Sequence, residues 1–155
     1  MPEIQQRTVP EQLVLTEQRH ITVPALSEWL PSTIGRLAST AERYGGIAGP
    51  VFVVYHGPVS EDNDGPVEVC VPISAPSDVT VDSPTRPEPA HREAYVRITR
   101  AQLKYPEILS AYEAVSTWLK EHGQTEIAAP REVYFTDVMA AGPTDEVCDV
   151  AYPIA

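Results

Sequence analysis

Two segments of this chain repeat one pattern, and the repeat limits the folds that the chain can adopt. Residues 49–73 read GPVFVVYHGPVSEDNDGPVEVCVPI, and residues 129–154 read APREVYFTDVMAAGPTDEVCDVAYPI. Each segment starts with a small residue and Pro, passes through an apolar stretch with one Tyr, crosses a polar loop and reaches Pro-Ile. The repeat aligns Tyr55 with Tyr134. We therefore predict one domain of two similar halves, with a groove for a small molecule near their pseudo-twofold axis.

The spacing of apolar residues predicts the same β-α-β-β order in each half, and hence an α+β fold. Strands show alternation, and helices show apolar residues three and four positions apart. The helices are expected to begin at Pro31 and Pro106, because proline is tolerated in the first turn of a helix. The expected strands are 12–21, 51–55 and 67–73 in the first half, and 92–99, 131–136 and 148–154 in the second.

A proline-rich connection separates the halves. The first half covers about residues 1–74, the linker about 75–90, and the second half about 91–155, all within a single domain of residues 1–155. The stretch Ser74–Ala90 carries four Pro, which favours a linker with at most a short extended piece at Val79–Val81.

The charge balance narrows the range of partners. With 11 basic and 22 acidic residues, the chain has a net charge of −11. Such a field repels the phosphates of nucleic acids and of anionic membranes, so we expect neither as a direct partner. The N-terminus lacks the pattern of a signal peptide, and no apolar stretch approaches the ~20 residues that span a bilayer. A cytoplasmic protein is therefore expected.

Cysteine and histidine indicate no metal or cofactor site. Cys70 and Cys148 each lie in a strand that runs into Pro-Ile, and are expected to be buried thiols in a reducing compartment. The four His are scattered, without the spacing of a zinc helix. No glycine-rich nucleotide motif is present. We expect no metal and no cofactor.

The segment PREVYFTD contains the strongest candidates for binding or catalytic residues. Strand alternation puts Glu132 and Tyr134 on one face, and Val133 and Phe135 on the other. The apolar face is expected to pack on the helices, so Glu132 and Tyr134 are expected to line the groove. A carboxylate among aromatic rings can hold a lipophilic cation, and a desolvated one can also act as an acid or base. The alternative is a solvent-facing Glu beside an ordinary strand Tyr.

Further candidates follow from the repeat. Glu68 and Asp149 hold matching places in the last strand of each half, and each faces either solvent or the groove. If both face inward, two carboxylates converge and can bind a cation or activate water. Tyr55 is the mate of Tyr134 and a candidate for stacking on a ligand. Trp118 is either another ligand contact or a core residue.

The motifs GPVFVVYHG, VEVCVPI, PREVYFTD and DVAYPI resemble the GyrI-like family, the effector-binding domain of multidrug-responsive bacterial transcription activators. The resemblance covers the whole chain. It implies eight strands, two helices and an aromatic cleft with an acid for lipophilic, often cationic, compounds. The groove acid falls on Glu132, its tyrosine on Tyr134, and the acid of the final strand on Asp149, where relatives often have Glu. RITRAQLKY stands where relatives often have a Gly-Pro-Tyr turn, so one cleft wall differs.

Three functions remain open on the sequence. The leading one is binding of an aromatic, cationic small molecule for drug sensing or sequestration, by Glu132, Tyr134, Asp149, Tyr55, Glu68 and Trp118. The second is a hydrolase of electrophilic cyclopropane rings, similar to some stand-alone relatives, with Glu132 or Asp149 as base and Tyr134 as donor. The third is an acidic protein-interaction module that mimics DNA toward a basic partner.

Overall fold

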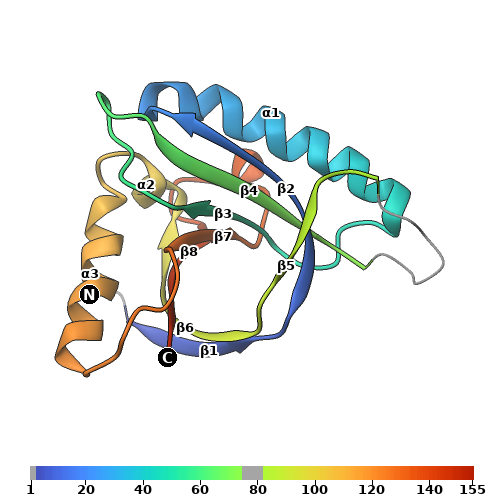
Figure 1. Cartoon of the computed structure of the whole chain (residues 1–155). Helices are drawn as coiled ribbons and strands as arrows, with labels where there is room; N and C mark the ends of the chain where they lie inside the picture. Colours follow the sequence, from blue (N-terminus) through green and yellow to red (C-terminus); the bar gives the residue numbers. More distant parts are fainter. Residues whose placement is uncertain (1–2, 75–81) are drawn as a thin grey trace. The chain divides into compact units, whose positions relative to one another are not determined.

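The computed structural model describes residues 3–74 and 82–155 (Figure 1). The chain divides into two compact units. Unit 1 comprises Met1–Pro10 and Ala90–Ala155, and unit 2 comprises Glu11–Pro89. The short extended piece predicted at Val79–Val81 lies outside the described residues. The first ten residues therefore cluster with the second half of the chain.

Unit 2 is an antiparallel sheet in the order β3-β4-β2-β5, with one long helix on it. In Figure 1 the helix α1 lies alongside β2 and β4. Glu17 of β2 identifies the face of the sheet that meets α1, because it binds Arg36 of the helix and lies opposite Val69 of β4. Val67, Val69 and Val71 of β4 therefore lie on that face. The elements are β2 (Gln12–Ile21), α1 (Val23–Ala41), a 3-10 turn (Glu42–Tyr44), β3 (Val51–Tyr55), β4 (Gly65–Ile73) and β5 (Thr85–Glu88).

The first helix begins eight residues before the predicted start, at Val23 rather than Pro31. Pro31 lies inside α1, although an interior proline removes a hydrogen bond and costs about 3 kcal/mol. Trp29 lies before the proline and Leu37 after it, and both are buried on one stripe with Thr33 and Ala41. The prediction was wrong because burial of a continuous stripe offsets the local cost of proline.

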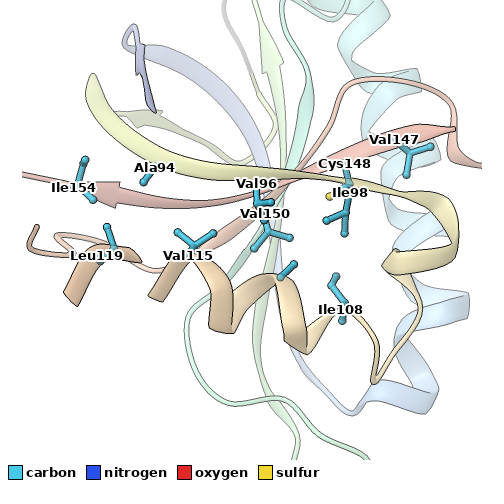
Figure 2. Close-up of a cluster of buried hydrophobic side chains, with 11 residues drawn as sticks. Ala94, Val96, Ile98, Ile108, Val115, Leu119, Val147, Cys148, Val150 and Ile154 are labelled. Atoms are coloured by element: carbon cyan, nitrogen blue, oxygen red, sulfur yellow. The ribbon is translucent and has the colours of Figure 1, made fainter. Parts of the chain in front are cut away.

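Unit 1 is an antiparallel sheet in the order β1-β6-β8-β7, with α3 against β6 and β8. Figure 2 shows the core that α3 and the sheet enclose, where Val96 and Val150 face Val115 of the helix. The elements are β1 (Gln5–Val9), β6 (His91–Thr99), α2 (Arg100–Leu103), α3 (Leu109–Glu121), β7 (Arg131–Tyr134), a 3-10 turn (Val138–Ala140) and β8 (Glu146–Ile154).

Two strands come from segments whose residues predicted no strand. β1 reads QQRTV and pairs with β6, and β5 reads TRPE and pairs with β2. Both are short and polar, so apolar alternation gives no signal for them. The described residues thus form eight antiparallel strands, four in each unit, and the α+β fold is confirmed. No helix among them is long and apolar enough to cross a membrane.

The strand registers of the two units correspond. Val69 of β4 lies opposite Val53, and Val150 of β8 lies opposite Glu132. The residues before Val69 and Val150 also match, because Glu68 lies opposite Val54 and Asp149 lies opposite Val133. Tyr55 lies opposite Val67 and Tyr134 opposite Cys148, so the tyrosines match as well. The residue correspondences that the repeat predicts therefore hold in the ladders, while the duplication of the halves about a pseudo-twofold axis stays a prediction.

Candidate functional site

A buried glutamate bound by two tyrosines is the centre of the candidate site in unit 1. Glu132 of β7 is 5% exposed. The hydroxyl of Tyr112, from α3, donates to its Oε2 at 2.5 Å, and the hydroxyl of Tyr134, from β7, donates to its Oε1 at 2.5 Å. Both carboxylate oxygens therefore accept a hydrogen bond, which offsets part of the cost of burying the group. We call these three residues the Glu132 site.

The Glu132 site lies on the helix side of the sheet, which corrects the prediction for this strand. Glu132 lies opposite Val150 and Tyr134 opposite Cys148, and Val150 and Cys148 belong to the core beneath α3. Val133 lies on the other face, opposite Asp149. The prediction that the apolar face packs on the helix was wrong, because Tyr112 of α3 supplies a hydroxyl that satisfies the acid there.

More aromatic and ionisable groups surround this site. The ring of Tyr152 meets that of Tyr112 edge-to-face, with centroids 6.2 Å apart. Burial, with the nearby charge of Glu126, raises the pKa of Tyr152 to about 12, so its hydroxyl keeps its proton. Burial, with the charges of Glu132 and Asp149, also raises the pKa of the Cys148 thiol. The Tyr152 hydroxyl and the Cys148 thiol therefore both keep their protons at neutral pH.

Trp118 takes a different position on α3. It packs against the core of unit 1, and its ring stacks on that of His122 with centroids 4.2 Å apart. The role of Trp118 as a ligand contact stays a prediction.

Asp149 lies on the opposite face from Glu132, in a network of charges. It is 1% exposed. Arg97 donates to both of its oxygens, at 2.8 and 3.0 Å, and Arg7 donates to Oδ2 at 2.8 Å. Arg7 also binds the buried Glu93 at 2.8 Å. Because arginines occupy both oxygens of Asp149, this carboxylate is neutralised and poorly placed to take a proton from water.

Glu68 is the centre of a matching network in unit 2. It is 4% exposed and accepts hydrogen bonds from Thr16 at 2.5 Å, from Arg86 at 2.6 and 3.0 Å, and from His56 at 2.8 Å. Burial alone would raise the pKa of Glu68, but hydrogen bonds from Arg86, Thr16 and His56 together lower it to about 2. Tyr55 lies on the α1 face, opposite Val67, so the structure does not bring it together with Glu68.

We expect Glu68 to make the protein less stable as the pH falls from about 4.5 to 2. The unfolded chain protonates Glu68 near its ordinary pKa of 4.5, whereas the folded chain keeps it ionised down to about 2. Between these two pKa values the unfolded state binds more protons than the folded state, so the free energy of unfolding decreases as the pH is lowered. The contribution is complete above about pH 4.5. Thermal melts should show a shallower fall of Tm across this window for Glu68→Gln than for the wild type, and equal slopes would contradict the assignment.

Sequence reasoning missed the residues that complete each cluster. Arg7 and Arg86 come from the two strands that show no apolar alternation, and Arg97 lies in β6, whose pattern indicates no acid partner. Tyr112 lies in α3, and the helical pattern alone indicates no polar partner for it. A hydroxyl in a buried helical stripe needs a hydrogen-bond partner, and that requirement was the available signal.

This α+β domain carries a tyrosine-bound carboxylate under its helix, and comparison identifies its family. The sequence matches the model of the GyrI-like small molecule binding domain over residues 2–155, so the chain belongs to the GyrI-like family. No curated protein matches the sequence significantly.

Solved structures with the same fold include two of EcmrR, one of a hydrolase and one of SAV2435. The C-terminal domain of EcmrR is 16% identical with a TM-score of 0.78, and the match covers 100% of this chain and 98% of that one. In the EcmrR–DNA complex the match is 16% identical, with a TM-score of 0.77, and covers 98% of this chain but 57% of that chain. A hydrolase from Listeria innocua is 12% identical, with a TM-score of 0.65 and coverage of 99% and 92%. SAV2435, bound to tetraphenylphosphonium, is 11% identical, with a TM-score of 0.62 and coverage of 99% and 94%. At these identities the likeness shows the fold alone.

Proposed function

We propose that this GyrI-like domain binds aromatic, lipophilic cations at the Glu132 site, for drug sensing or sequestration. The observation that carries the proposal is the buried carboxylate of Glu132 with a tyrosine hydroxyl on each oxygen. A negative charge removed from water is strongly attracted to a cation that sheds its own weak hydration easily. The faces of Tyr112 and Tyr134 add stacking and cation–π attraction.

The position of the tyrosines supports entry of a ligand. Tyr112 and Tyr134 are both partly exposed, whereas Glu132 is buried. A cation therefore meets aromatic surface first and reaches the acid when the tyrosine side chains move. SAV2435, which shares the fold, was solved with tetraphenylphosphonium, a cation of this chemistry. That compound is accordingly the probe for this chain.

Replacement of Glu132 by Gln tests the proposal. Titration calorimetry with tetraphenylphosphonium should show affinity at least about tenfold weaker for Glu132→Gln than for the wild type, the effect of losing about 1.4 kcal/mol or more of charge attraction. Triphenylphosphine oxide, a neutral aromatic analogue, should bind both proteins equally.

The matched control is Glu113→Gln, which removes an exposed carboxylate next to Tyr112 on the same helix. It should leave the affinity for the cation unchanged. If Glu132→Gln binds the cation as tightly as the wild type does, the Glu132 site is not where the ligand's charge is recognised.

The geometry gives less support to a hydrolase that uses the predicted acids. Both oxygens of Glu132 accept hydrogen bonds from tyrosine hydroxyls, and both oxygens of Asp149 accept hydrogen bonds from arginine guanidinium groups. A general base needs a lone pair directed at water. Binding is therefore the function that the site in unit 1 supports best.

A further inference from the structure

A histidine and a glutamate form a pair in unit 2 that small-molecule binding in unit 1 does not use. His56 follows the last residue of β3, and its Nε2 lies 2.8 Å from Oε1 of Glu68. The side chain of His56 is 37% exposed, whereas that of Glu68 is 5% exposed. The pair therefore joins a buried carboxylate to an imidazole that reaches solvent.

The other hydrogen-bond partners of Glu68 determine which atom of this pair carries the proton. Arg86 and Thr16 donate to its carboxylate, and its pKa of about 2 keeps it ionised at neutral pH. An ionised carboxylate can only accept, so Nε2 of His56 must carry the proton. In the neutral imidazole, Nδ1 then holds a lone pair and can accept a proton. A buried acid that fixes the tautomer of an accessible histidine is the arrangement of a general base.

The matching position in unit 1 shows that the acid does not require a histidine. Phe135 follows Tyr134 as His56 follows Tyr55. Phe135 packs under the guanidinium of Arg97, 4.3 Å from its ring centroid, and Asp149 is satisfied by arginines. In unit 2, Arg86 already neutralises Glu68 in the same way. His56 thus adds a titratable group where the fold needs only a neutralised acid.

We propose that His56 is the general base of a second site, in unit 2, which hydrolyses small uncharged activated esters. Nδ1 of His56 takes a proton from water as the water oxygen bonds to the carbonyl carbon. The bond from that carbon to the leaving group then breaks, the leaving group takes the electron pair, and the proton returns from Nδ1 to the leaving group or to solvent. Glu68 acts as a positioning residue that holds the tautomer.

The charges around the pair favour an uncharged substrate. Glu68 and Glu88 both bind Arg86, with contacts of 2.6 Å each, so the guanidinium is committed to two carboxylates. The two carboxylates outnumber this one guanidinium, so the cluster presents an incoming anion with a net negative field. A neutral ester can approach it without that repulsion.

Hydrolysis of p-nitrophenyl acetate by the full chain tests the proposal. His56→Gln should lower the rate by about 100-fold or more, the usual contribution of a general base. His20→Gln and His122→Gln are the controls, because both remove an exposed histidine. They should keep the wild-type rate. A His56→Gln rate equal to that of the wild type, or hydrolysis lost equally in all three variants, would overturn the assignment.

Two further measurements test whether Glu68 positions His56 and whether hydrolysis is independent of the Glu132 site. Nitrogen-15 NMR at about pH 8 should show His56 protonated on Nε2 in the wild type, and a mixture of tautomers in Glu68→Gln together with slower hydrolysis. An unchanged tautomer in that variant would remove Glu68 from its positioning role. Glu132→Gln should bind the cation at least about tenfold more weakly yet hydrolyse the ester at the wild-type rate, so either site can fail without the other.

Discussion

Replacing Arg86 by Met is expected to lower the free energy of unfolding by about 3–5 kcal/mol. The guanidinium binds Glu68 at 2.6 and 3.0 Å and Glu88 at 2.6 Å. These carboxylates are 4% and 5% exposed, so the substitution leaves two buried negative charges without this cation. Met keeps much of the apolar stem, which limits the loss of packing. Urea unfolding of the two proteins at neutral pH measures the difference.

Arg36→Met is the matched control for this prediction. Arg36 also binds a carboxylate with two N–H groups, at 2.9 Å each, but its side chain is 57% exposed and that of its partner Glu17 is 34% exposed. A surface pair of this kind contributes at most about 1 kcal/mol. Equal losses for the two variants would show that burial does not set the strength of the Arg86 network.

Placing a glutamate at position 53 is expected to destabilise unit 2 by about 3 kcal/mol or more beyond the effect of side-chain size. Val53 holds the ladder position of Glu132 but is fully buried on the α1 face, opposite Val69. Glu132 is satisfied there by Tyr112 from the helix. The buried residues of α1 include no tyrosine: they are Trp29, Thr33, Leu37 and Ala41. A new carboxylate would therefore lack the tyrosine hydroxyl that the helix of unit 1 provides.

Val53→Met measures the cost of a longer apolar side chain at the same position and is expected to cost about 1–3 kcal/mol. Chemical unfolding of Val53→Glu, Val53→Met and the wild type gives the difference that belongs to the charge. That difference should shrink at low pH, where the new carboxyl is protonated. If the two variants are equally stable at neutral pH, the helix partner is not what permits an acid at this ladder position.

The strands that the repeat predicts agree with the structure for a physical reason. The predicted strands 12–21, 51–55 and 67–73 correspond to β2, β3 and β4, because apolar, valine-rich stretches of this length favour buried strands. The same pattern located β6, β7 and β8. Local pattern and tertiary burial point the same way in these segments, which makes them predictable from the sequence.

The edge strands and the start of α1 could not be predicted in this way. β1 and β5 hold their places by backbone pairing and by Arg7 and Arg86, which bind Glu93, Asp149 and Glu68 on other strands. α1 continues through Pro31 because its buried stripe spans both sides of the proline. Each depends on contacts with other elements, which the local sequence does not contain.

The sequence by itself determined the repeat, the α+β class, the matched positions of Glu68 with Asp149 and Tyr55 with Tyr134, and the pairing of Glu132 with Tyr134 on one face. These follow from the two-residue period of a strand, which is a local property. Only the tertiary structure decided that this face meets α3, that Tyr112 binds the acid, and that arginines neutralise Asp149 and Glu68. Which face of a strand is covered, and by which polar partner, depends on long-range burial and hydrogen bonding, because a buried acid is stable only where another element satisfies it.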